Sequence, residues 1–156
     1  FFLRHAKSSW DDFALKDFDR PLSTRGIQDA ELMGNFFRSK KISLDLILSS
    51  PSKRTRETLE HFFPKKTPKL EFFQNIYHAT MDDILENIYQ LSEEIKNIMI
   101  VGHNPSMHDT TEYLTQKFLN KYPTCALAEV SSESKWIEFA QGCTILENFK
   151  KPSELR

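Results

Sequence analysis

Short apolar blocks recur along the chain at wide spacing, and longer segments between them mix apolar with polar residues. The blocks are rich in Leu, Ile, Val and Phe, which is typical of strands that are buried on both faces of a sheet. We therefore predict strands at residues 1–3, 44–48, 70–73, 98–101, 125–130 and 136–139.

The segments between the blocks place apolar residues three and four positions apart, which is the spacing of an amphipathic helix. In the first such segment Ile27, Ala30 and Met33 share one helical face. The predicted helices cover residues 27–40, 52–63, 81–95 and 106–119.

Strands that alternate with helices predict a parallel sheet with right-handed crossovers. A Ser-rich turn separates the last two blocks, so we expect 125–130 and 136–139 to form an antiparallel hairpin. The predicted fold class is α/β, a three-layer sandwich with a mostly parallel central sheet and helices on both faces. The 156 residues fit a single domain, which we place at 1–150, followed by a loose Lys-rich tail at 151–156.

Composition narrows the classes of partner and compartment. A net charge of -1 creates no field that attracts nucleic acid or an acidic membrane, so we expect neither as a partner. No apolar run approaches the ~20 residues of a membrane span, and residues 1–3 are too short for the core of a signal peptide. The two cysteines form no disulfide framework and favour a reducing, cytoplasmic location. Because no initiator Met is present, we expect the natural start to lie upstream.

Side chains suited to phosphate binding follow three of the predicted strands. Arg4 and His5 leave the first block at its carboxyl end, and His103 leaves the fourth block after Gly102. The carboxyl ends of parallel strands share one edge of the sheet, where α/β proteins place their ligand sites. Arg54 lies in the first turn of the helix after the second strand, and the amides at that helix start can hold an anion. Arginine matches phosphate oxygens with a planar fork, so these residues predict a phosphate pocket.

The polar segment at residues 6–22 holds few apolar pairs, and we expect it to form a loop of the active site. Within it, Arg20 either lies at the rim of the pocket or forms a structural salt bridge. Ser8 either contacts phosphate or substrate, or lies on the surface of the loop.

The ordered set of motifs resembles the signatures of the histidine phosphatase superfamily, the group that includes cofactor-dependent phosphoglycerate mutase. Leu3-Arg4-His5-Ala6 is similar to the first signature, Ser50-x-x-x-Arg54-x-x-x-Thr58 to the second and Gly102-His103 to the third. Residues 4–10 and 17–26 are most similar to the SixA-type phosphohistidine phosphatases. The resemblance therefore implies a phosphoglycerate mutase-like fold.

The resemblance also implies a mechanism. His5 would be the nucleophile, and its ring nitrogen would attack phosphorus to give a phosphohistidine intermediate that water hydrolyses. Arg4, Arg54 and His103 would surround the transferring phosphoryl group and neutralise its oxygens. No metal or other cofactor is then needed, and the sequence offers no acidic cluster with ligand spacing. The wider superfamily has glycine where this chain has Ala6, which we interpret as a marker of the SixA-like branch.

The proton donor for the leaving group is not defined by a motif. The wider superfamily takes a Glu or Asp from the segment after the third strand, where this chain has Asp82 and Asp83. Either could be the general acid, and both also fit the acidic first turn of an ordinary helix. A phosphoramidate substrate needs such an acid less, because an imidazole nitrogen is readily protonated from solvent.

The expected activity is removal of phosphate from phosphohistidine in a protein. The segment between Thr58 and Gly102 is nearly filled by predicted elements, which leaves little chain for a cap over the pocket. One alternative is a phosphatase for small phosphorylated metabolites, which a deep pocket with Asp82 or Asp83 near His5 would favour. The other is a non-catalytic phosphate-binding module, in which His5 would be misplaced.

Overall fold

A single six-stranded sheet runs through the computed structural model, which describes residues 1–156. The strand order is β3-β2-β4-β1-β5-β6. The first four strands in this order are parallel, whereas β5 runs antiparallel to both β1 and β6. The prediction of a mostly parallel sheet is thus confirmed. The strands are β1 (Phe2–Arg4), β2 (Leu46–Ser49), β3 (Leu70–Phe72), β4 (Ile98–Gly102), β5 (Leu127–Ser131) and β6 (Ile145–Lys150).

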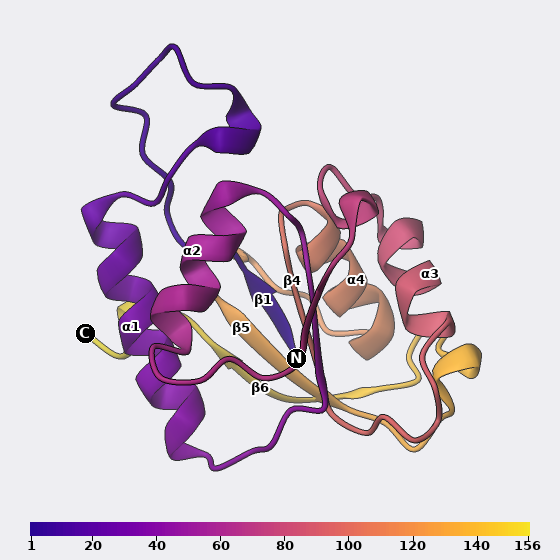
Figure 1. The fold of residues 1–156 in the computed structure, drawn as a ribbon. Helices are drawn as coiled ribbons and strands as arrows, with labels where there is room; N and C mark the ends of the chain where they lie inside the picture. The colour runs from indigo at the N-terminus through magenta and orange to yellow at the C-terminus, as the bar shows by residue number, and fades with distance from the viewer.

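Two helices cover each face of the sheet, as Figure 1 shows. Strand β4 illustrates why both faces are apolar, because its successive side chains point to opposite sides. Ile98 and Ile100 pack into one core with α3 and α4, whereas Met99 and Val101 pack into the other core with α1 and α2. The three-layer α/β prediction is therefore confirmed. The helices are α1 (Thr24–Ser39), α2 (Lys53–Phe62), α3 (Met81–Tyr89) and α4 (Ser106–Thr115).

The hairpin at the antiparallel edge differs from the one we predicted. Residues 136–139 are not a strand: Trp136–Glu138 form a 3-10 helix, and β6 is the true partner of β5. The aromatic rings of Trp136 and Phe139 pack together 5.0 Å apart, and the Trp136 indole donates to the carbonyl of Ile95. The apolar block at 136–139 is thus a cluster of aromatic rings and not a strand. The strand β6 lies at the sheet edge and mixes exposed with partly buried residues, so it lacks the continuous apolar run from which we predicted strands.

The C-terminal residues, for which we expected a loose tail, are docked onto α1. Pro152–Glu154 form a 3-10 turn, and Pro152 is buried. Arg156 Nη2 contacts both carboxylate oxygens of Asp29, at 2.8 and 2.9 Å. Asp29 is buried in α1 and needs a cationic partner, which the chain end supplies together with Arg25.

The polar segment between β1 and α1 projects beyond the carboxyl ends of the strands (Figure 1). It is closed at its base, where the Ser23 amide donates to the Lys7 carbonyl at 2.9 Å. Gly26 makes this closure feasible, because a Cβ at that position would lie 2.1 Å from the Lys7 carbonyl oxygen. The base of the loop is therefore fixed two residues after His5. No helix is both long and apolar enough to span a membrane.

Candidate active site

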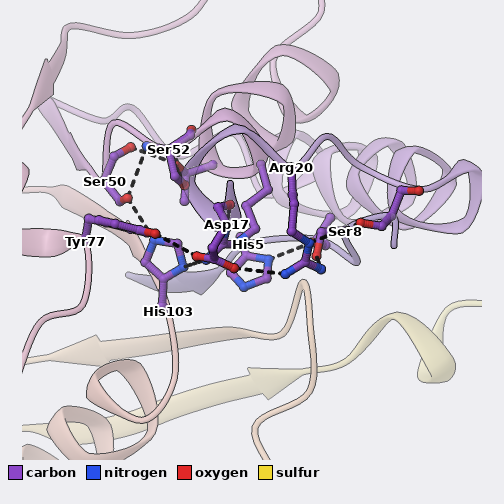
Figure 2. A network of polar contacts seen from close by, with 12 residues as sticks. His5, Ser8, Asp17, Arg20, Ser50, Ser52, Tyr77 and His103 are labelled. Atoms are coloured by element: carbon purple, nitrogen blue, oxygen red, sulfur yellow. Dashed lines mark hydrogen bonds and ion pairs between the residues drawn. The ribbon is translucent and has the colours of Figure 1, made fainter. Parts of the chain in front are cut away.

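Three of the predicted pocket residues meet at the carboxyl edge of the sheet. His5 follows β1, His103 follows β4, and Arg54 lies in the first turn of α2. The rings of His5 and His103 lie 5.0 Å apart, and Arg54 Nη2 lies 3.2 Å from His103 Nδ1. All three side chains are buried, and Figure 2 shows the two histidine rings as neighbours. The geometry therefore brings together residues that are up to 98 positions apart in sequence, as the strand ends predict.

His5 is held as a neutral ring with one defined tautomer. Its Nδ1 lies 2.7 Å from the carbonyl oxygen of Ala6, which can only accept, so Nδ1 carries the proton. Nε2 therefore keeps its lone pair and is free to act as a nucleophile. Burial, together with the charges of Arg54 and Arg4, lowers the pKa of His5 to about 3. The imidazole is therefore neutral at any physiological pH.

His103 has the opposite tautomer. Arg54 donates to Nδ1, so the proton resides on Nε2, which donates to Ser50 Oγ at 2.8 Å. Burial, followed by the nearby His5 and Arg54, lowers the pKa of His103. His103 therefore joins the pocket as a neutral group, oriented from both sides.

Arg4 contributes a further cation to the same region. Its Nη1 donates to the Tyr122 carbonyl at 2.8 Å, whereas its Nε is buried with no hydrogen-bond partner. Burial, followed by the charge of Arg54, lowers the pKa of Arg4. A buried guanidinium group is costly unless hydrogen bonds or an anion compensate its charge.

A threonine of α2 links the backbone after His5 to the turn that carries Arg54. Thr58 Oγ1 accepts from the amide of Ala6 at 2.9 Å and donates to the Arg54 carbonyl at 2.6 Å. Thr58 lies one turn after Arg54 on the same face of the helix. One hydroxyl therefore couples the backbone that follows His5 to the helix that carries Arg54.

Asp17, which sequence reasoning did not single out, lies at the centre of the polar network in Figure 2. Its Oδ2 accepts from the Tyr77 hydroxyl at 2.7 Å and from Arg54 Nη2 at 3.1 Å. Its Oδ1 accepts from Arg20 Nη1 at 3.0 Å. Although partial burial opposes it, hydrogen bonding to Tyr77 and the charge of Arg54 lower the pKa of Asp17 to about 2. The sequence signal was the position of Asp17 at the start of the segment 17–26, which resembles the SixA-type phosphatases.

Tyr77 and His78 form one wall beside His103. The Tyr77 ring lies 5.5 Å from the His103 ring and 4.0 Å from that of His78. His78 adopts a left-handed backbone, with φ of 55°, which turns the chain at this point. Tyr77 therefore lies against His103, and His78 packs behind the Tyr77 ring.

Arg20 and Ser8 lie together in the loop. Arg20 pairs with Asp17, donates to Ser8 Oγ and to the Ser9 carbonyl, and stacks over Trp10 at 3.3 Å from the ring centroid. The salt bridge we offered as an alternative for Arg20 is therefore present. Its charge also helps to lower the pKa of His5, so Arg20 belongs to the electrostatic surroundings of the pocket as well.

The candidate acids on α3 are not joined to this network. Asp83 accepts from the amide and hydroxyl of Thr80 in a capping box, and these bonds lower its pKa. No hydrogen bond or ion pair links Asp82 or Asp83 to Arg54 or either pocket histidine. The structure therefore uses Asp83 as a helix cap. No group of three or more His, Cys, Asp or Glu side chains is arranged to hold a metal ion.

The two pocket histidines should not titrate near neutral pH. Between about pH 5 and pH 8 we expect the ring resonances of His5 and His103 to keep constant chemical shifts, because burial and neighbouring arginines favour the neutral rings. Histidine NMR across this range tests the expectation, with His5→Asn used to assign the signal. In urea the same residues should titrate near ~6.5. A folded-state titration of His5 near neutral pH would contradict the electrostatic description.

The sequence of the chain matches proteins of one known superfamily. Residues 1–76 match the sequence profile of the histidine phosphatase superfamily, branch 1. An uncharacterized protein of Mycobacterium leprae is 30% identical over 148 residues, which cover 86% of this chain and 89% of the relative. The phosphohistidine phosphatase SixA of Escherichia coli K12 is 37% identical over 60 residues, 38% of this chain and 36% of SixA.

Solved structures agree with the sequence matches. A crystal structure from Agrobacterium tumefaciens, provisionally assigned as the phosphohistidine phosphatase SixA, superposes with a TM-score of 0.82. The two chains are 29% identical, and the match covers 97% of this chain and 96% of the other. The match therefore extends over nearly the full length of both chains.

Proposed function

Since the chain belongs to branch 1 of the histidine phosphatase superfamily and is a SixA-like phosphatase, we propose that it removes the phosphoryl group from phosphohistidine in a protein, with His5 as the nucleophile. The observation that carries this proposal is the neutral His5 ring with its free Nε2, beside Arg4, Arg54 and His103. A phosphorylated substrate follows from the family, and the protein-bound phosphohistidine is our proposal.

In the proposed first step the Nε2 lone pair of His5 attacks phosphorus as the bond from phosphorus to the leaving nitrogen breaks. Arg54 and Arg4 stabilise the charge on the phosphoryl oxygens, and His103 can donate from Nε2 only if it leaves Ser50. The leaving imidazole takes a proton from solvent. In the second step water attacks the phosphohistidine, which releases inorganic phosphate and restores His5.

The bonds made by two nearby carboxyl groups, Asp83 and Asp17, favour a nitrogen leaving group. Asp83 caps α3, and Asp17 is ionised in its contacts with Arg54 and Tyr77, so neither carboxyl group holds a proton to give. An alkoxide leaving group needs general acid assistance, whereas an imidazole nitrogen is protonated readily by water. This chemistry supports phosphohistidine over a small phosphoester.

Access to the pocket also supports a protein substrate. The chain between α2 and β4 contains only β3, a 3-10 turn at Gln74–Ile76 and α3. These elements supply the edge strand β3 and part of one helical layer (Figure 1), so no separate segment of this stretch is left to form a cap. A side chain presented by another protein could therefore reach the pocket.

A substrate comparison tests the proposal. We expect kcat/KM for a phosphohistidine-bearing protein to exceed that for phosphoserine peptides and small phosphoesters by at least about 100-fold, since the general acid contributes on that scale for oxygen leaving groups. Phosphate release is measured for each substrate under the same conditions. A preference for a small phosphoester would overturn the protein-substrate proposal while leaving the phosphatase assignment intact.

A further inference from the structure

The arginine that is expected to hold the phosphoryl group is already engaged by an anion of the chain itself. Arg54 Nη1 donates to the Asp17 carbonyl at 2.8 Å, and Nη2 donates to the Asp17 carboxylate at 3.1 Å. Nη2 also donates to His103. Of the five N–H donors of the guanidinium group, three are thus in use, two of them on Asp17.

The same carboxylate holds a second arginine and a phenol. Asp17 Oδ1 accepts from Arg20, and Oδ2 accepts from the hydroxyl of Tyr77. A carboxylate and a phosphoryl group offer arginine the same chemistry, because both present two oxygens to the planar fork. An incoming phosphoryl group must therefore share the donors of Arg54 with Asp17 or displace it.

The position of Asp17 suits displacement. It lies in the three-residue 3-10 turn Asp17–Asp19, within the loop that projects from the sheet edge, and no residue of this turn is buried. The Asp17 side chain is 42% exposed, so its carboxylate can move into water without opening either core. Arg54, by contrast, is 7% exposed and anchored on α2.

We propose that Asp17 is an internal counter-anion, which neutralises Arg54 and Arg20 in the free enzyme and is displaced when a phosphoryl group binds. The proposal rests on the proposed function only in taking Arg54 as a phosphoryl ligand. Asp17 then lowers the apparent affinity of the pocket for inorganic phosphate, which is the product. The reason is that phosphate can use the donors of Arg54 only in the fraction of molecules in which Asp17 has released them.

Direct binding of inorganic phosphate tests this role. Isothermal titration calorimetry with the Asp17→Asn variant should give phosphate binding about fivefold tighter than with the unchanged protein, the scale of a partly exposed ion pair. Asp19→Asn is the matched control, because it removes the same charge from the same turn, where Asp19 has no ion pair. The phosphate affinity of Asp19→Asn should stay within about twofold of that of the unchanged protein.

The kinetic readout separates this role from a structural one. Product inhibition by phosphate should become stronger in Asp17→Asn to the same extent as the calorimetric affinity. If Asp17 instead positioned Arg54 for the substrate, the variant would bind phosphate more weakly, and this result or an unchanged affinity overturns the inference. Should Asp17→Asn fail to fold in a thermal-unfolding control, Asp17→Ser removes the same charge and carries the same expectation.

The outcomes also distinguish this inference from the proposed function. Equal phosphate affinity in Asp17→Asn and the unchanged protein, with binding lost in Arg54→Ala, overturns the role of Asp17 and leaves the pocket assignment standing. Phosphate binding that survives Arg54→Ala overturns both, because Arg54 would then not be the ligand for which Asp17 competes.

Discussion

Replacing His5 with alanine should lower kcat/KM for every phosphorylated substrate by at least about 10,000-fold, the scale seen when a nucleophile is removed from a covalent mechanism. The reason is specific to this ring: its Nδ1 proton is committed to the Ala6 carbonyl, so Nε2 is the one atom placed to attack. Nothing else in the pocket can replace it, because both nitrogens of His103 are occupied by Arg54 and Ser50. Phosphate release assays on the purified variant measure the loss.

The His5→Ala experiment needs a control for folding and one for histidine loss in general. His61→Ala removes a histidine from the outer face of α2, where it contacts Glu31, and should retain activity. Circular dichroism should show the same secondary structure for both variants. Turnover by His5→Ala within tenfold of the unchanged enzyme would mean that a different group attacks phosphorus.

Loss of Arg54 should produce the second large effect. Arg54→Ala should lower kcat/KM by about 100-fold to 1,000-fold, the range for removing a preorganised donor that stabilises transition-state charge. The Arg54 guanidinium is buried and lies against His103. The other arginine of α2, Arg56, bonds to the Pro51 carbonyl instead and cannot replace it. Arg54→Lys should recover only part of the loss, because an ammonium group cannot reproduce the planar fork.

Arg56 provides the matched control for Arg54. It lies on the same helix but donates to the Pro51 carbonyl and stacks over Phe72 at 3.8 Å from the ring centroid. Arg56→Ala should therefore change kcat/KM by no more than a few fold. Equal losses in the two variants would show that the net charge of α2 matters and not the position of Arg54, and would contradict the pocket geometry.

The strands that carry the site could be predicted because the buried parallel strands are continuous apolar runs. Residues 98–101 are apolar throughout, and the structure confirms a strand there with both faces buried. The same criterion was wrong at 136–139, where an aromatic cluster packs as a 3-10 helix against Ile95. It also missed β6, which lies at the sheet edge and contains exposed and partly buried residues but no fully buried one.

The site was predictable to the extent that its residues follow strand ends. His5, His103 and Arg54 could be placed together because parallel strands share a carboxyl edge. The pairing of Asp17 could not be predicted, since its partners Arg54 and Tyr77 lie 37 and 60 positions away and the loop between β1 and α1 has no periodicity. The docked C-terminus was missed for the same reason, because a charged tail gives no sign of the buried Asp29 that it pairs with.

The hydrogen bond from His5 to the carbonyl of its own neighbour has a consequence for the chemical identity of the intermediate. Because Nδ1 retains its proton, only the nitrogen farther from the backbone can become phosphorylated, so the enzyme would carry the τ isomer of phosphohistidine and not the π isomer. The acceptor is a backbone atom, so the isomer does not depend on the side chain at position 6. Alanine at this position therefore leaves the regiochemistry of the intermediate unchanged.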